Sequence, residues 1–547
     1  MPLLICARGQ TAKRNSAQNQ IAGTLAGSEF TPATVGHALL LRTDGMRSAF
    51  RLEAWHYHGR DPVSAIHQQL EPTSIEAVRR LADQAFSRAA GAPLIDGNHV
   101  RVLKDAQENY PAWLAAIGRA QHHVHFESYI IHEDDVGREF AEALIAKAAE
   151  GAAVRLIYDW MGGFGKTSRH FWNRLRAAGI DVRCYNPPRW DSPLGWLSRD
   201  HRKMLAVDGQ VGFIAGLCVG QIWVGDPAKR IDPWRDTGIE VRGPALAAIE
   251  KAFAEVWAML GGGISASEIL PEEARSPAGD VSVRVVATLP ATAGLFRVDQ
   301  LVAALARKRL WLTDAYYAAT TTYVQALKAA AADGVDVRLL LPNGTDIPLL
   351  KPLSRAGYRP LLEAGVRVFE WNGTMLHAKT AVADGHWARV GSSNLNLASW
   401  LSNCELDAII EDEQFAQEME VMYLRDLANA TEIVLDSKQK VRAPGEPRHP
   451  RPTTSGGGSA GRAAAGAIRL SNTLGAAFTN RRVLDSAEAR MMTLFGILLL
   501  GLAILFTFFP KVLLYPAVVL LAWMALALLY KGYRLYRQRG RERRTPH

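Results

Sequence analysis

The sequence has few cysteines and lacks any metal-binding arrangement of them. Its four cysteines are spread over 547 residues, and none forms a CxxC pair or another ligand spacing. A disulfide framework is therefore not expected, and a reducing compartment such as the cytoplasm suits the chain. The chain begins with only a short apolar stretch, PLLICA, which is too short for the core of a signal peptide.

Positive charge is scarce in most of the chain, although the net charge is +9. Residues 438–469 and residues 531–547 each hold seven basic residues and one acidic residue, so these two segments contribute +12 and the remainder about −3. Enzymes that act on nucleic acids usually have a basic body. A nucleic-acid partner is therefore not expected.

Charged residues are absent from two 19-residue runs, 491–509 and 512–530, which only Pro510 and Lys511 separate. A helix of that length spans roughly 28 Å, close to the roughly 30 Å hydrocarbon core of a bilayer. Basic residues on both flanks favour both ends on the cytoplasmic side. We expect residues 485–534 to form a membrane hairpin, which either crosses the bilayer fully or is re-entrant and does not fully cross it. The body would then lie on the cytoplasmic face of a bacterial inner membrane.

The rest of the chain divides by composition. Residues 436–470 are rich in Pro, Gly, Ser and basic residues, which is typical of a flexible linker. Residues 535–547 form a basic tail, and residues 1–90 carry no chemical signature, so we assign them no role. Between them we expect two related domains, 91–270 and 275–435.

An internal repeat relates these two domains. LAAIGRAQHHVHFESY at 114–129 parallels LVAALARKRLWLTDAY at 301–316, and AAEGAAVRLIYD at 148–159 parallels AADGVDVRLLLP at 331–342. Helix-like stretches alternate with short apolar strands, which predicts an αβα sandwich with a mixed sheet in each half. Two halves related by a pseudo-twofold axis would bring equivalent residues together in one shared site.

Each half contains the same short motif, and the copies lie 176 positions apart. It reads His201-x-Lys203-x4-Asp208 in the first half and His377-x-Lys379-x4-Asp384 in the second. Histidine can serve as a nucleophile or proton donor near neutral pH. A lysine two positions along a strand points the same way and can neutralise a phosphate. These six residues are the candidate catalytic set, for breaking and remaking a phosphodiester without a metal or cofactor.

Three more histidines, His122, His123 and His125, occur in a strand-like stretch, but their spacing is not that of metal ligands. No metal site is expected there. A single HxK motif is a weak signal, because its residues could be solvated charges on a surface strand. Two copies inside a long repeat are a strong one.

Over residues 95–435 the chain resembles two-motif members of the phospholipase D superfamily, and bacterial cardiolipin synthases in detail. The resemblance rests on HFESYIIHEDDVGREFAEAL, VRLIYDWMGGFG, HRKMLAVDG, WRDTGIEVRGPA and HAKTAVADGHWARVGSSNLN. It implies that Asp236 and Glu405 hydrogen bond to the Nδ1 atoms of the motif histidines. It also implies that Asp208 and Asp384 are structural, and that a Gly-Ser-x-Asn element contributes to phosphate binding, here Gly391, Ser392 and Asn394.

The resemblance implies ping-pong phosphatidyl transfer between two phosphatidylglycerol molecules at a membrane, without an obligate protein partner. His201 would be the nucleophile and His377 the acid and base, although the reverse assignment stays open. Cys218 stands where the first half of cardiolipin synthases commonly has Asn, which we interpret as a tolerated substitution. Three alternatives remain: a phospholipase D that uses water as acceptor, a nuclease of the same superfamily, and a scaffold without activity.

Overall fold

The computed structural model describes residues 75–189, 198–265, 268–347, 350–435, 441–442, 497 and 500–542. Most of the N-terminal region 1–90 and of the linker 436–470 lies outside these residues. So do much of the first predicted membrane run, 491–509, and the end of the basic tail. Within the N-terminal region one helix is described, α4 (Ile75–Ala90).

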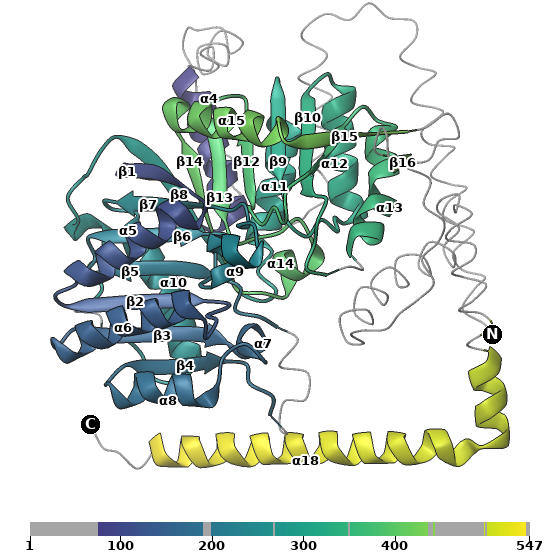
Figure 1. Cartoon of the computed structure of the whole chain (residues 1–547). Coiled ribbons are helices and arrows are strands. Elements are labelled where there is room, and N and C mark those ends of the chain that lie inside the picture. Colours follow the sequence, from purple (N-terminus) through teal and green to yellow (C-terminus); the bar gives the residue numbers. More distant parts are fainter. Residues whose placement is uncertain are drawn as a thin grey trace, which may run out of the picture. The chain divides into compact units, whose positions relative to one another are not determined.

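Two copies of one α/β fold make up the body; in Figure 1 the first runs from purple through blue to teal and the second from teal to green. The strands of the first copy are β1 (Ile95–Lys104), β2 (His123–Ser128), β3 (Ala153–Asp159), β4 (Asp181–Tyr185), β5 (Lys203–Val207), β6 (Val211–Ala215) and β7 (Thr237–Arg242). The strands of the second copy are β8 (Val281–Thr288), β9 (Arg309–Thr313), β10 (Asp336–Pro342), β11 (Arg367–Trp371), β12 (Thr380–Ala383), β13 (Trp387–Gly391) and β14 (Glu405–Glu411), followed by β15 (Ala430–Leu435) and β16 (Val441–Arg442).

Helices connect and cover these strands. Those of the first copy are α5 (Asp105–Arg119), α6 (Asp135–Ala149), α7 (Trp160–Gly163), α8 (Arg169–Ala177), α9 (Gln221–Val224) and α10 (Leu246–Met259), with short 3-10 turns η2 (Pro227–Lys229) and η3 (Glu272–Ala274). Those of the second copy are α11 (Gly294–Leu305), α12 (Thr321–Ala332), α13 (Leu350–Leu362), α14 (Leu397–Leu401) and α15 (Glu413–Leu427).

The strand order shows the symmetry of the two copies. All strands join one 16-stranded sheet in the order β16-β15-β11-β10-β9-β12-β13-β14-β8-β1-β7-β6-β5-β2-β3-β4. Counted outward from the centre, the first copy runs β1-β7-β6-β5-β2-β3-β4 and the second runs β8-β14-β13-β12-β9-β10-β11. The two innermost strands, β1 and β8, pair antiparallel. The predicted pseudo-twofold arrangement and mixed sheets are confirmed.

Alternation along buried strands supplies both faces of the sheet with apolar side chains. In β5, Leu205 and Val207 join the core under α5, α6 and α8. Met204 and Ala206 join a different core, which contains α10 and α15 and draws on both copies. A third core lies under α11, α12 and α13 of the second copy. The shared core fixes one copy against the other, and with it any site built from both.

Local sequence explains where the equivalent helices begin and end. Asp134 caps α6 and Thr320 caps α12, each by accepting a hydrogen bond from a backbone N–H of the first turn. After these helices the chain turns at Gly151 and Gly334, which adopt φ values of +98° and +89°. Glycine suits this left-handed conformation because it has no Cβ. These turns deliver the chain to β3 and β10 at matching positions.

The C-terminal apolar sequence forms a long helix, α18 (Pro510–Glu542), yellow in Figure 1. Its segment Leu514–Arg534 has 21 residues and a mean hydropathy of 1.7, which is long and apolar enough to cross a membrane. This segment contains most of the second predicted run, 512–530. The other arm of the predicted hairpin is described only in part, so the hairpin itself stays a prediction.

Candidate active site

Each motif histidine is held by the backbone of the opposite copy. His201 lies just before β5, and its N–H donates to the carbonyl of Cys404 at 2.9 Å. His377 lies just before β12, and its N–H donates to the carbonyl of Arg235 at 2.7 Å. Cys404 comes immediately before Glu405, the first residue of β14. Arg235 comes immediately before Asp236, which directly precedes β7. The motif of one copy is thereby brought against the acidic residue of the other.

The histidine side chains follow the same crossed pattern. The His201 Nδ1 atom lies 2.9 Å from Oε2 of Glu405. The His377 Nδ1 atom lies 2.6 Å from Oδ2 of Asp236. Each carboxylate accepts the Nδ1 proton, so the Nε2 atom of each imidazole keeps a free lone pair when the ring is neutral. Both pairs are almost entirely buried, with His201 8% and His377 5% exposed.

Further donors hold the Glu405 carboxylate in place. The Ser392 hydroxyl donates to its Oε2 atom at 2.6 Å, and the Asn403 amide donates to its Oε1 atom at 3.1 Å. Ser392 therefore supports the carboxylate, and the contribution to phosphate binding that the resemblance implies stays a prediction. Asn403 is a residue that the sequence reasoning missed, although it lies two positions before Glu405.

Different groups hold the Asp236 carboxylate. The Trp223 indole N–H donates to Oδ2 at 3.2 Å, and the Thr237 backbone N–H donates to Oδ1 at 2.9 Å. Gly216, the counterpart of Ser392, lies so close that a Cβ there would be 2.2 Å from Oδ1 of Asp236. The two copies thus reach the same histidine–carboxylate geometry with different supporting side chains.

The motif lysines lie beside their histidines, and each is fully buried. Each Nζ atom donates to the main-chain carbonyl of its own motif histidine, Lys203 to His201 and Lys379 to His377. Tyrosines at matching positions complete the arrangement. The Tyr129 ring lies 5.0 Å from the His201 ring, and the Tyr316 ring lies 5.8 Å from the His377 ring, both edge to face.

The motif aspartates do not touch the histidines' imidazole rings. Asp208 accepts three backbone N–H groups, from residues 121, 122 and 123, at 2.7 to 2.9 Å. Asp384 accepts three from residues 307, 308 and 309, at 2.8 to 2.9 Å. Both aspartates have positive φ, at +52° and +53°. The geometry agrees with the structural role that the resemblance implies for these two members of the candidate catalytic set: they fasten the turns after β5 and β12 to the starts of β2 and β9.

Burial sets the protonation of the site. It lowers the pKa of His201 to about 4, with the Lys203 ammonium acting in the same sense and Glu405 opposing. It lowers the pKa of His377 to about 3, aided by Lys379. Although burial alone would raise it, the contact with His201 brings the pKa of Glu405 down to about 2. At neutral pH the site therefore holds neutral imidazoles and ionised carboxylates.

The two ammonium groups also act on each other. Burial and the nearby Lys203 charge lower the pKa of Lys379 to about 8. A bound phosphodiester would place a negative charge where the two ammonium groups repel each other. By the same Coulomb effect it would raise the pKa of both imidazoles, favouring the cationic form that a general acid needs.

The comparisons with known proteins cover the same two copies. A family model described as "Cardiolipin synthase, PLD-like domain" matches residues 113–218 and 302–427. A cardiolipin synthase of Alkalihalophilus pseudofirmus is 33% identical over 391 residues, which are 68% of this chain and 76% of the relative. Cardiolipin synthase A of Pseudomonas fluorescens is 33% identical over 369 residues, covering 66% and 74%. The chain belongs to the cardiolipin synthase family.

The fold agrees with this membership. The crystal structure of a phosphatidylserine synthase from Haemophilus influenzae superposes with a TM-score of 0.51 and 13% sequence identity, covering 64% of this chain and 92% of that one. This likeness concerns the fold. The family membership makes the chain an enzyme of the phospholipase D superfamily.

The element after β6, where this family member has Ala215-Gly216-Leu217-Cys218, packs differently from its counterpart after β13. Cys218 is 1% exposed, and burial raises the pKa of its thiol. Its carbonyl accepts the Tyr110 hydroxyl at 2.6 Å. A buried thiol with a raised pKa is a poor nucleophile. In the second copy, Asn394 is buried and its Oδ1 atom has no partner among the described residues, so it keeps a free polar atom.

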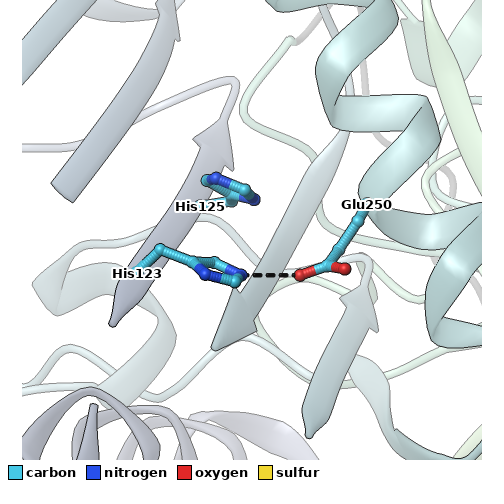
Figure 2. A group of neighbouring side chains, drawn as sticks. All are labelled: His123, His125 and Glu250. Atoms are coloured by element: carbon cyan, nitrogen blue, oxygen red, sulfur yellow. Dashed lines mark hydrogen bonds and ion pairs between the residues drawn. The ribbon is translucent and has the colours of Figure 1, made fainter. Parts of the chain in front are cut away.

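Figure 2 shows a group of side chains that the spacing of the histidines did not reveal. Nitrogen and oxygen atoms of His123, His125 and Glu250 lie within 4.8 Å of one another, because α10 brings Glu250 onto β2. The Nε2 atom of His123 is 2.8 Å from Oε1 of Glu250, which is a direct hydrogen bond. The two imidazoles stack with ring centroids 4.5 Å apart.

Charged neighbours decide how this group is interpreted. Arg155 donates to Nε2 of His125 at 3.2 Å, and Arg275 donates to the second oxygen of Glu250. Two guanidinium groups in contact with the candidate ligands repel a divalent cation, and stacked rings do not aim their lone pairs at one point. We interpret the group as a buried ion-pair network that packs beside the Asp208 turn.

A cavity of about 370 Å³ lies apart from the motif histidines His201 and His377. It is lined mainly by apolar residues of β1, α10 and the segment around η3, among them Ile95, Ala248 and Leu270. None of the motif residues, Asp236 or Glu405 lines it. The chemistry of the chain is therefore assigned to the crossed histidine pairs and not to this cavity.

Proposed function

We propose that this enzyme makes cardiolipin by transferring the phosphatidyl group of one phosphatidylglycerol to the headgroup hydroxyl of another. The observation that carries the proposal is the pair of buried imidazoles, His201 and His377, each with Nδ1 on a carboxylate of the opposite copy. This arrangement leaves two Nε2 atoms available for one phosphate. The relatives are named cardiolipin synthases, which supports cardiolipin as the product.

In the first step His201 is the nucleophile. Its Nε2 lone pair forms a bond to phosphorus, and the bond from phosphorus to the headgroup glycerol breaks. His377, protonated while the phosphodiester is bound, gives its Nε2 proton to the leaving glycerol oxygen. Glu405 stabilises the positive charge that develops on His201, and Lys203 and Lys379 neutralise the phosphate oxygens.

The second step reverses the first with a different alcohol. His377, now neutral, takes the proton from a headgroup hydroxyl of a second phosphatidylglycerol. The oxygen attacks phosphorus, and the bond to His201 breaks. The products are cardiolipin and the free glycerol released earlier. Because the motif histidines are almost buried, an alcohol bound in the site has an advantage over bulk water, which opposes hydrolysis to phosphatidic acid.

The same proposal includes a location. Phosphatidylglycerol is insoluble in water, and a tethered enzyme meets it at a high local concentration. The candidate span Leu514–Arg534 would anchor the chain in a bacterial inner membrane. The basic residues that flank the apolar runs favour a body on the cytoplasmic face. Protease accessibility of the body in inside-out and right-side-out membrane vesicles tests this orientation.

The reaction is tested with the purified full chain in detergent–phosphatidylglycerol micelles containing EDTA, with lipids analysed by mass spectrometry. We expect cardiolipin and glycerol in equal amounts. Phosphatidic acid without cardiolipin would show a hydrolase, and neither product would show that phosphatidylglycerol is not the substrate.

Variants of the two motif histidines test the shared site. H201A and H377A should each abolish turnover, and robust activity in either would exclude the mechanism. H170A is the matched control, because His170 is exposed at the start of α8. A phosphatidyl group trapped on His201 by rapid denaturation at neutral pH, and identified by peptide mapping without acid, would assign the nucleophile; the same adduct on His377 would reverse the roles.

A further inference from the structure

The two copies differ at the loop that follows the third strand of each. After β3 the loop is apolar: it contains Trp160 and Phe164, whose rings lie 5.0 Å apart, and Phe164 is 66% exposed. After β10 the loop reads Asn343-Gly344-Thr345-Asp346 and is polar. The repeat places Gly163 at the position of Asp346. The carboxylate near Tyr129 in the first copy, Asp159, is 1% exposed and accepts the backbone N–H groups of Met161 and Asp200. The two sides of the pseudosymmetric site therefore differ, because the carboxylate of the second copy is exposed and that of the first is buried.

Contacts connect Asp346 to the proposed acid and base. Its Oδ1 atom accepts the Tyr316 hydroxyl at 3.0 Å. The Tyr316 ring lies edge to face with His377, and the Lys379 ammonium lies 5.8 Å from the centre of the same ring. Asp346 itself is exposed. The Tyr316 ring thus holds an accessible carboxylate one side chain away from His377.

The charge of Asp346 limits what it can bind. A carboxylate repels a phosphate, so this group does not belong to the phosphodiester position. It accepts hydrogen bonds, with roughly four lone-pair sites on its two oxygens. An ammonium headgroup gains less here, because Lys379 lies within electrostatic reach of the same carboxylate. Neutral hydroxyl groups are the donors that fit best.

We propose that Asp346, positioned by Tyr316, binds the hydroxyl groups of a polyol headgroup on the His377 side of the site and selects a polyol over a monohydric alcohol. This inference rests on the proposed function. The leaving glycerol and the incoming headgroup both react on the His377 side, so one subsite serves both steps. A polyol has a spare hydroxyl to donate to Asp346 while another reacts, and a monohydric alcohol has none.

The test uses the exchange reaction of the full chain. Cardiolipin is incubated with glycerol and 1-propanol at equal concentrations, and the ratio of phosphatidylglycerol formed from glycerol to phosphatidylpropanol is measured with labelled glycerol. The native enzyme should favour glycerol. D346N and D346A should lower this ratio about tenfold or more, because a hydrogen bond to a charged acceptor is lost. Y316F should lower it less, since the carboxylate remains but is no longer held.

Controls separate selection from a loss of folding. E363Q is the matched control, because Glu363 is exposed just after the C-terminal end of α13 and pairs with Arg359; its ratio should equal that of the native enzyme. D346E should retain part of the preference. Thermal unfolding of each variant shows whether it folds. If D346A does not fold, Y316F provides a second test of the polyol subsite.

Each outcome has a meaning. An unchanged ratio in folded D346N, or an equal fall of both products, would overturn the polyol subsite while leaving cardiolipin formation intact. A native preference for ethanolamine over glycerol would also overturn it. A native enzyme that forms neither cardiolipin from phosphatidylglycerol nor any exchange product would instead refute the proposed function.

Discussion

The Nδ1 atom of His201 lies 2.9 Å from Oε2 of Glu405, 204 positions later and in the other copy of the fold. The same relationship joins His377 to Asp236, 141 positions earlier. Neither copy alone contains a motif histidine together with the carboxylate that its Nδ1 atom contacts. The repeat is therefore required for each half of the chemistry, and the interface between copies is part of the active site.

The first prediction concerns this crossed pair. E405Q should lower kcat by roughly 10²–10⁴-fold, because an amide neither fixes the Nδ1 proton nor stabilises a cationic imidazole as well. The His201 adduct should form more slowly in quenched-flow measurements. E432Q is the control, since Glu432 pairs with Arg367 at the surface. An E405Q enzyme with native kcat would show that the pair is structural.

The second prediction separates structural aspartates from catalytic groups. D208A removes the acceptor of three backbone N–H groups and should cost about 2–4 kcal/mol of the free energy of unfolding. D208N keeps one amide oxygen and tolerates positive φ, so its loss should be smaller. Below its lowered Tm, folded D208N should keep kcat within about tenfold. D280A, at an exposed position, should change neither quantity.

The third prediction concerns Gly216. A Cβ at this position would lie 2.2 Å from Oδ1 of Asp236, so G216A must displace that carboxylate from His377. We expect kcat to fall at least tenfold, because His377 then loses the carboxylate that positions it as a proton donor. G118A is the matched control, because a Cβ there meets no atom within 4 Å. Equal activity of the two variants would contradict the packing argument.

The fourth prediction is a pH dependence of stability. The folded pKa values of His201 and His377, about 4 and about 3, lie below the unfolded value near 6.5. Their contribution to stability is complete above pH 6.5, and it is lost progressively as the pH falls from about 6.5 to these folded values. Between pH 7 and pH 5 each should account for roughly 2 kcal/mol of the lost free energy of unfolding.

Chemical denaturation at pH 7 and pH 5 measures this loss. H201N and H377N should each lose less stability than the native chain over that interval. Glu405 does not interfere, because its low pKa confines its own effect to pH values below about 4.5. Identical pH dependence in native and variant chains would show that the imidazoles are not buried in the neutral form.

Several features could be predicted from the amino-acid sequence, because each is encoded locally. The repeat of helix-like and strand-like stretches predicts the αβα sandwich in each half, and the repeated motif predicts a shared site. The apolar run 512–530 predicts the helix that α18 forms. The resemblance to a known family also places Asp236 and Glu405 on the histidines, although it does not say which carboxylate belongs to which ring.

Other features depend on residues that meet only in the folded chain. The hydrogen bond from Ser392 to Glu405 forms because β13 and β14 pair beside each other, and the motif spacing does not predict it. The contact of His123 with Glu250 depends on how α10 packs on the sheet. The spacing of histidines within one strand carries no information about a carboxylate on a distant helix.

The sequence by itself determined the two copies of the fold, the motif residues and the chemistry they can perform, because strand alternation and residue type act over a few neighbouring positions. Only the tertiary structure decided that each motif histidine pairs with the carboxylate of the other copy, and that Asp346 accepts the hydroxyl of Tyr316. The physical reason is the antiparallel pairing of β1 with β8 and the core shared by both copies. These contacts set one copy against the other, and no local pattern specifies that placement.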